Sequence, residues 1–256
     1  FRSRNVEITY GYRPVYVHSV SAANLALDRL YIHHFSNYGA YFTGSSATAA
    51  LTNSEIHQQG VASPTTCLYL DSAGAATFSG LKLHHCATGA SLSETSTTIQ
   101  DSLVWGNTSR GFYVYKGSST ARVLTLKNST VYGNGPYAFD LYNGTSSNLG
   151  MAAVTDTLIA GHTTAAFYSS YYYSSYNQVS YQYCDVWNNG SALSYVTATS
   201  TTGSIVENPL LADPASGDFR PTERSPPRFS DSSSSTPKGT IGLYDYDGVA
   251  TPGYQG

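Results

Sequence analysis

Charged side chains are scarce in this sequence. Asp, Glu, Lys and Arg together make up 11% of the 256 residues, whereas they make up about 25% of an average globular protein. The formal net charge is −3 and the few cations are scattered, so a nucleic acid is not expected as a partner. Helix-favouring runs are also missing, and there is a single Met. The 23 Gly and 23 Tyr instead favour many short strands joined by turns.

Long apolar runs are absent as well. No stretch of 18 apolar residues occurs, so no membrane-spanning helix is expected. No signal segment follows Phe1, and the chain is interpreted as a mature or excised part of a longer protein. The three cysteines, Cys67, Cys86 and Cys184, form no CxxC pair. They allow one disulfide with one remaining thiol, or three buried thiols. We favour the buried thiols, and the cysteines leave the compartment undecided.

A repeat runs through most of the chain. The stretch NSTVYGN, from Asn128 to Asn134, has a close variant, DSLVWGN, at Asp101 to Asn107. When the copies are aligned on Val131, eight aliphatic residues share one position, 21 to 28 residues apart; we call them the anchors: Ile32, Ile56, Leu83, Val104, Val131, Ile159, Val186 and Leu211. Five residues before the anchors stand eight more apolar residues: Leu27, Leu51, Phe78, Ile99, Leu126, Val154, Tyr181 and Val206. Ile8 would anchor a ninth, partial copy.

Asn and Asp recur at fixed distances from the anchors. Three residues before the anchor stand Asn53, Asp101, Asn128, Asp156 and Asn208, and three residues after it stand Asn107, Asn134 and Asn189. Asn tolerates a left-handed backbone and its amide can stack between coils, so Asn107, Asn134 and Asn189 are predicted to be structural turn residues.

Alternating runs follow about eight residues after the anchor and predict half-buried strands. Their apolar members are expected to point inward: Phe112, Val114, Phe139, Leu141, Phe167 and Leu193. The residues between them are expected to point outward: Tyr113, Tyr115, Asp140, Tyr142, Tyr168 and Ser194.

Short strands with an Asn turn at this period predict an all-β fold, a parallel β-helix or solenoid of eight to nine coils, each copy forming one turn. A leucine-rich repeat would need a helical side, and a propeller blade would need about forty residues. We expect the coils, including the terminal one, to occupy residues 1–229. A Ser-rich linker and an irregular closing tail would occupy 230–256.

The coils resemble those of the right-handed parallel β-helix proteins of the pectate-lyase-like superfamily, in the form found in secreted and surface proteins of bacteria. The resemblance extends to the tail, where NPLLADP at Asn208 is followed by GDFR at Gly217 and TIGLYD at Thr240. The tail departs from the usual pattern at Pro227 to Phe229 and at Asp245. The resemblance implies the fold and a secreted or cell-surface location. It implies no single function, because the superfamily includes enzymes, adhesins and structural fibres.

One residue past the anchors lies a column of rings: His33, His57, His84, Trp105, Tyr132 and Trp187, with Ala160 before the last. Neighbouring coils place equivalent side chains about 4.8 Å apart. Three His in a column could hold a zinc or copper ion, with His34 and His85 beside them. A linear stack is a poor tetrahedral site, however. We therefore favour a stacking ladder on the surface or along a groove, and expect no cofactor.

The outward tyrosines form a second candidate surface. Tyr113, Tyr115, Tyr142 and Tyr168 would form an aromatic strip, extended by Tyr171, Tyr172, Tyr173 and Tyr176. Aromatic faces stack on sugar rings, and Tyr is also common in protein interfaces. The strip is therefore interpreted as a glycan surface, a protein contact, or an uncharged outer strand surface. Trp105, Tyr132 and Trp187 join the same candidate binding set.

No catalytic constellation stands out. Lys82, Lys116 and Lys127 share no equivalent position, and the Asp residues are spread over different coils, whereas glycoside hydrolysis needs a carboxylate pair. We expect a non-catalytic extracellular module that is structural or adhesive, stacks or assembles into fibres, or binds glycan. The alternative is a polysaccharide lyase or glycoside hydrolase. The expected partners are further coils or another copy at the open N-terminal end, and a polysaccharide.

Overall fold

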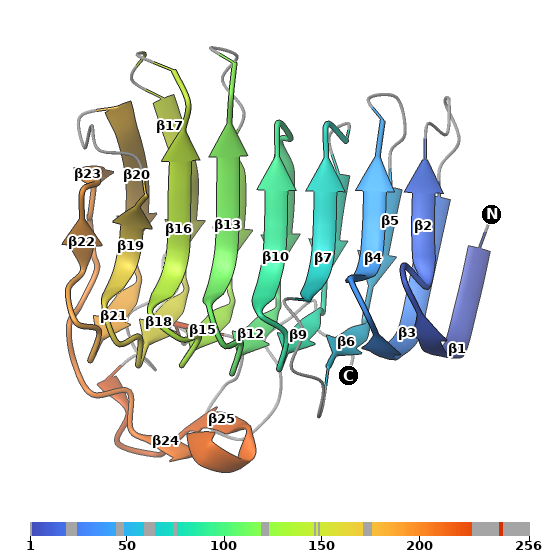
Figure 1. The fold of residues 1–256 in the computed structure, drawn as a ribbon. Helices are drawn as coiled ribbons and strands as arrows, with labels where there is room; N and C mark the ends of the chain where they lie inside the picture. Colours follow the sequence, from blue (N-terminus) through green and yellow to red (C-terminus); the bar gives the residue numbers. More distant parts are fainter. Residues whose placement is uncertain are drawn as a thin grey trace.

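The computed structural model describes residues 2–18, 25–44, 49–58, 65–73, 76–118, 123–145, 147, 149–170, 176–226 and 241–242. Nearly all of its regular structure is β-strand, wound into a parallel solenoid with successive turns side by side (Figure 1). Within these ranges no helix is long and apolar enough to cross a membrane. The all-β solenoid fold predicted from the repeat is confirmed.

The solenoid has three faces. The first face consists of β5 (Ala49–Thr52), β8 (Ala76–Ser79), β11 (Thr97–Gln100), β14 (Leu124–Lys127), β17 (Leu149–Thr155), β20 (Asn177–Gln182) and β23 (Thr197–Ser200). The second face consists of β6 (Glu55–His57), β9 (Lys82–His84), β12 (Leu103–Trp105), β15 (Thr130–Tyr132), β18 (Leu158–Ala160) and β21 (Asp185–Trp187). The third face consists of β2 (Val15–His18), β4 (Tyr38–Thr43), β7 (Thr66–Asp71), β10 (Thr88–Ser93), β13 (Arg110–Lys116), β16 (Tyr137–Asn143), β19 (Ala165–Ser169) and β22 (Leu193–Ser194).

Six turns contain one separate strand on each face, from β5–β6–β7 to β20–β21–β22. In the two turns before them, the first and second faces share one long strand, β1 (Arg2–Gly11) or β3 (Leu25–Phe35). The expected count of eight to nine coils therefore differs slightly from the six three-stranded turns of the structure.

The predicted register is confirmed for most of the chain. Each anchor from Ile8 to Val186 is the direct neighbour of the next across parallel strands. The apolar column five residues earlier pairs in the same way from Leu27 to Tyr181. Side chains alternate on a strand, so these two columns fill the interior while their neighbours point outward.

The prediction of an eighth anchor at Leu211 is wrong. The last turn comes earlier than predicted, because β23 pairs with β20 and Ile205 bridges to Asp185. The chain then leaves the solenoid: Val206 is 68% exposed. Leu211 lies in β24 (Leu211–Asp213), which pairs antiparallel with β25 (Asp218–Pro221) after a short 3₁₀ turn at Pro214–Ser216.

Left-handed residues make the corners beside the second face. Three residues before the anchor, φ is positive in eight successive turns, at Asn5, Arg29, Asn53, Gly80, Asp101, Asn128, Asp156 and Tyr183. Two residues after the anchor φ is positive in every turn except that of Ile56, at Tyr10, His34, His85, Gly106, Gly133, Gly161 and Asn188. The left-handed residue after the anchor is thus one position earlier than Asn107, Asn134 and Asn189, which were predicted to make that turn.

Those three asparagines form a buried hydrogen-bonded ladder instead. Asn107 Nδ2 donates to Asn134 Oδ1 over 2.7 Å, and Asn134 Nδ2 lies 3.3 Å from His162 Nε2. His162 Nδ1 is 2.8 Å from Asn189 Oδ1. Each Asn also donates to the carbonyl of an anchor in the preceding turn, as Asn134 does to Val104 O over 2.9 Å. The ladder also accepts backbone N–H groups of the corner, those of Cys86, Asn107 and His162.

A disulfide joins Cys67 on β7 to Cys86 before β10, while Cys184 is a buried free thiol. The preference for three buried thiols is therefore wrong for the first two cysteines. Neighbouring turns of a solenoid bring together residues about one repeat apart, and these two are 19 residues apart with Cα atoms 5.9 Å from each other. That separation lies in the range that a disulfide spans.

Candidate functional site

The outer surface of the second face carries the predicted ring column. His33, His57, His84, Trp105, Tyr132, Ala160 and Trp187 are direct neighbours across the strands from β3 to β21. The sequence pattern therefore identified one continuous row. The row divides into a histidine part at its N-terminal end and an aromatic part at its C-terminal end.

The histidine part is a face-to-face stack. The ring centroids of His33 and His57 are 5.6 Å apart, and those of His57 and His84 are 4.8 Å apart, with the planes within 3° for the second pair. Trp105 closes the stack 3.9 Å from His84. Because the rings lie parallel, their nitrogens point sideways in the ring planes and do not converge on a point between the turns.

Each stacked histidine has a different partner at Nε2. His33 is 2.9 Å from Glu7, His57 is 2.9 Å from the Tyr31 hydroxyl, and His84 is 3.1 Å from Glu55. Burial, aided by the nearby His84, lowers the pKa of His57 to about 4. The hydrogen bond from His84 lowers the pKa of Glu55.

This geometry does not support a single metal ion held across His33, His57 and His84. Within the described ranges, no group of three His, Cys, Asp or Glu side chains is placed to hold a metal ion. The alternative prediction, a stacking ladder, matches the ring contacts.

The C-terminal segment 207–221, which we call the strap, crosses the aromatic part of this face (Figure 1). Phe219 fixes it: its side chain is 2% exposed and packs on Leu103, with its ring 5.7 Å from Trp105 and 5.3 Å from Tyr132. Ser225 adds a buried hydrogen bond to the carbonyl of Pro209. The strap thus turns an exposed sheet surface into the wall of a groove.

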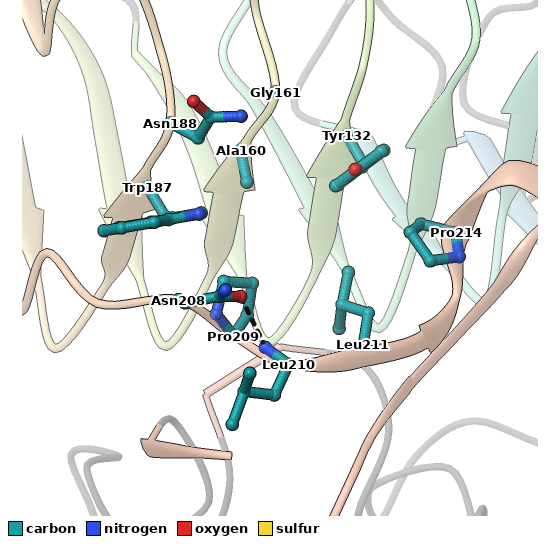
Figure 2. A pocket seen from close by; sticks show the side chains of 10 residues that line it. All are labelled: Tyr132, Ala160, Gly161, Trp187, Asn188, Asn208, Pro209, Leu210, Leu211 and Pro214. Carbon is teal, nitrogen blue, oxygen red and sulfur yellow. Dashed lines mark hydrogen bonds between the residues drawn. The ribbon is translucent and has the colours of Figure 1, made fainter.

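A pocket of about 240 Å³ lies between the strap and the solenoid (Figure 2). Tyr132 and Trp187 lie on either side of Ala160 on the solenoid, and the strap contributes the opposite wall. The complete lining is Tyr132, Ala160, Gly161, Trp187, Asn188, Asn208, Pro209, Leu210, Leu211 and Pro214. None of these side chains is charged. The pocket therefore offers aromatic and apolar surface with two amides for hydrogen bonding.

A buried carboxyl stands at the start of the same strand as Trp187. Asp185 has no exposed surface, and burial raises its pKa to about 7. Its Oδ1 accepts the backbone N–H of Glu207, at the start of the strap, over 3.2 Å. Its Oδ2 has no hydrogen-bond partner among the described residues. The sequence showed Asp185 only as one Asp among several, because the strap that covers it was predicted to be a further coil.

Comparison with known proteins agrees with this architecture. The family model described as "Right handed beta helix region" matches residues 3–153, more than half of the chain. The chain belongs to the right-handed β-helix family. A solved structure, "Crystal structure of pectate lyase Pel9A", is similar to this β-helix protein with a TM-score of 0.54 and 12% sequence identity, covering 95% of this chain and 87% of that one. At this identity the likeness shows the fold. No curated protein matches the sequence significantly.

The predicted tyrosine strip of this β-helix protein lies on the third face, apart from the ring column. Tyr113 and Tyr115 are on β13, Tyr142 is on β16 and Tyr168 is on β19. Their rings pack on one another: Tyr115 stacks 5.4 Å from Tyr142, and Tyr168 stacks 4.1 Å from Tyr137. The predicted binding set is therefore divided between two surfaces.

Among the residues predicted to point outward, Asp140 is nevertheless buried. It pairs with Arg110, and burial raises its pKa. Tyr171, Tyr172 and Tyr173, the Ser-rich linker and most of the tail after residue 229 lie outside the described residues. The boundary expected at residue 229 stays a prediction.

Proposed function

We propose that this β-helix protein is a non-catalytic extracellular module that binds polysaccharide in the strap pocket. The observation that carries the proposal is the pocket itself, in which Tyr132 and Trp187 flank a site closed by the strap. Aromatic rings stack on the apolar faces of sugars, and amides such as Asn188 and Asn208 bond to hydroxyl groups.

The size and charge of the pocket favour one sugar unit of an uncharged glycan. Pockets for drug-sized ligands are about 300–1,000 Å³. A pocket of 240 Å³ therefore suits a single sugar ring, with the neighbouring sugars of the polysaccharide in solvent. The absence of charged side chains from the lining leaves an anionic uronate without a counter-charge.

The third face is the weaker candidate for glycan binding. Its tyrosine rings already stack on one another. Ring faces in mutual contact are less available to a sugar than that of Trp187, which lines the pocket.

The extracellular part of the proposal is supported by the Cys67–Cys86 disulfide. Structural disulfides persist in oxidising compartments and are rare in the cytosol. A secreted or surface protein with few charges and a repetitive outer surface fits an adhesive or structural role.

The second candidate is a polysaccharide-degrading enzyme. It is favoured by the similar fold of a protein named pectate lyase, and by the raised pKa of Asp185, since a carboxyl that is partly protonated at neutral pH can act as an acid. Asp185 is fully buried, however, and a general acid must lie within hydrogen-bond reach of its substrate.

A pull-down with insoluble neutral and uronate-containing polysaccharides tests the proposal. We expect the wild-type chain to be retained by a neutral glycan and Tyr142→Ala, on the third face, to bind normally. Trp187→Ala should bind about 2–13-fold more weakly through the loss of stacking, which contributes about 0.5–1.5 kcal/mol beyond the buried area. Retention by no glycan would refute the proposal. New reducing or unsaturated ends that Asp185→Asn abolishes would establish the enzyme instead.

A further inference from the structure

Two pairs of adjacent histidines stand at the end of the second face, His33–His34 and His84–His85. In each pair the first residue is a stacked member of the ring column. The second has a left-handed backbone, with φ of 57° at His34 and 55° at His85. That conformation turns the second ring back toward the first: the rings of His84 and His85 meet edge to face, with centroids 4.9 Å apart.

The two rings of each pair meet through their Nδ1 atoms. In the second pair the Nδ1 atoms are 2.6 Å apart, and in the first pair they are also in direct contact. Neither nitrogen is held by a backbone carbonyl in this contact; each faces another imidazole. One of the two must carry the proton that the other accepts, since two lone pairs would repel.

A carboxylate orients the first ring of each pair. Glu55 accepts from Nε2 of His84, and Glu7 accepts from Nε2 of His33. A proton fixed at Nε2 leaves Nδ1 as the lone-pair nitrogen of a neutral imidazole. A histidine that binds a metal through one nitrogen usually donates the other N–H to a carboxylate in the same way.

The turn between the two pairs contains a related arrangement with an amide. Its residues are His57 and Gln58, both buried. His57 Nδ1 and Gln58 Oε1 have no hydrogen-bond partner among the described residues. His57 therefore lacks the second imidazole that faces Nδ1 in the other two turns, and Gln58 does not have the left-handed backbone of His34 and His85.

We propose that each His–His pair chelates one divalent transition-metal ion of the Zn²⁺ or Cu²⁺ class through its two Nδ1 atoms, with solvent completing the coordination. Imidazole nitrogen is a preferred donor for these ions. Two metal–nitrogen bonds of about 2.0–2.1 Å at a tetrahedral angle separate the nitrogens by about 3.3 Å. His85 is exposed, so its ring can move outward by the missing ~0.7 Å. As the metal binds, the proton shared by the two Nδ1 atoms is lost from Nδ1 of the second histidine while its Nε2 takes up a proton from solvent, so both rings bind as neutral imidazoles.

The two-nitrogen chelate differs from a metal held across the turns. It lies within one turn, and it needs neither His57 nor convergence of the stacked rings. It also agrees with the lack of any preformed group of three ligating side chains in the described ranges.

Isothermal titration of the tag-free chain with ZnCl₂ and CuCl₂ tests the proposal. We expect two ions per wild-type chain, one in His85→Ala or His34→Ala, and none in the double variant. His18→Ala, which removes a histidine outside both pairs, serves as the control and should still bind two. Glu55→Gln should keep the His84–His85 site but weaken it about 10–100-fold.

The middle turn provides a matched control. Gln58→His adds a histidine beside His57 without the left-handed backbone that brings the two rings of each pair together, and it should leave the stoichiometry at two. In the Cu²⁺ form, electron paramagnetic resonance should show two equivalent nitrogens per ion. A wild-type chain that binds neither metal, or stoichiometry unchanged in the double variant while circular dichroism shows intact β-structure, would overturn the proposal.

Discussion

His162 is the residue whose chemistry depends most on its neighbours. It occupies a rung of the buried ladder between Asn134 and Asn189. Nδ1 donates to Asn189 Oδ1 and Nε2 accepts from Asn134 Nδ2, so one neutral tautomer satisfies both neighbours. A second proton on Nε2 would face the Asn134 amide hydrogens. Burial accordingly lowers the pKa of His162 to about 4.

The first prediction concerns stability below neutral pH. Because the folded-state pKa of His162 is lower than the unfolded value of 6.5, the unfolded chain binds more protons below pH 6.5. Stability therefore falls as the pH drops from 6.5 to about 4, by up to about 3 kcal/mol. His162→Asn keeps the amide ladder and removes this titration. Urea unfolding at pH 7.5 and 4.5 should show a smaller loss for the variant.

The pKa of His57 is also lowered. The His162→Asn variant should therefore still lose some stability as the pH falls. His18→Asn, at an exposed position, is the matched control and should leave the wild-type slope. Equal pH dependence in His162→Asn and the wild type would show that His162 is not neutral in the ladder.

The sequence predicted the positions of the ladder better than its chemistry. Asn107, Asn134 and Asn189 were found because the same residue type recurs at one offset. His162 was missed because it differs in type, although it can donate and accept in the same plane. The left-handed backbone was predicted one residue too late, at the asparagines. Gly106 and Gly133 adopt the positive φ instead, and a glycine has no side chain that would indicate this role in the sequence.

At the scale of elements, the strap depends on one side chain. Phe219 is the buried contact between the strap and the rings of Trp105 and Tyr132. Replacement of a buried Phe by Ala costs about 3–5 kcal/mol. We expect Phe219→Ala to release the strap while the solenoid stays folded, because the anchor core lies on the other side of the sheet.

Hydrogen exchange would measure this directly. Amides of residues 210–222 should exchange much faster in Phe219→Ala, while those of β13 and β16 should be unchanged. Leu210→Ala, at a side chain that is 37% exposed, should have little effect. Unchanged exchange in the strap would mean that Phe219 does not hold it.

The strap was not predictable from the repeat. Val206 and Leu211 have the spacing of the apolar pair in a coil, and only the pairing of β23 with β20 shows that the last turn has already closed. The register of the other turns was predictable, because a solenoid stacks equivalent residues and a one-residue slip would expose its core.

At the scale of the molecule, stability is distributed over neighbouring turns, since each repeat contacts only the adjacent ones. The disulfide Cys67–Cys86 joins the strand β7 to the next turn. A closed loop of this length contributes about 3 kcal/mol in the chain-entropy model. We expect Cys67→Ser with Cys86→Ser to lower the free energy of unfolding by that order.

Dithiothreitol provides a matched comparison for the disulfide prediction. Under reducing conditions the wild-type chain should approach the stability of the double variant, and the variant itself should not respond. The Cys184→Ser variant, which replaces the buried free thiol, should respond to reductant as the wild-type chain does. A wild-type chain that is insensitive to full reduction would contradict the prediction.

The central claim is that glycan binds between the strap and Tyr132 and Trp187, and not on the third face. Hydrogen exchange with a saturating glycan identified by the pull-down tests it most directly. The account predicts slower exchange at residues 207–212 and 186–189, with no change at 111–116 or 138–143. Protection confined to the third face, with the strap unaffected, would contradict it.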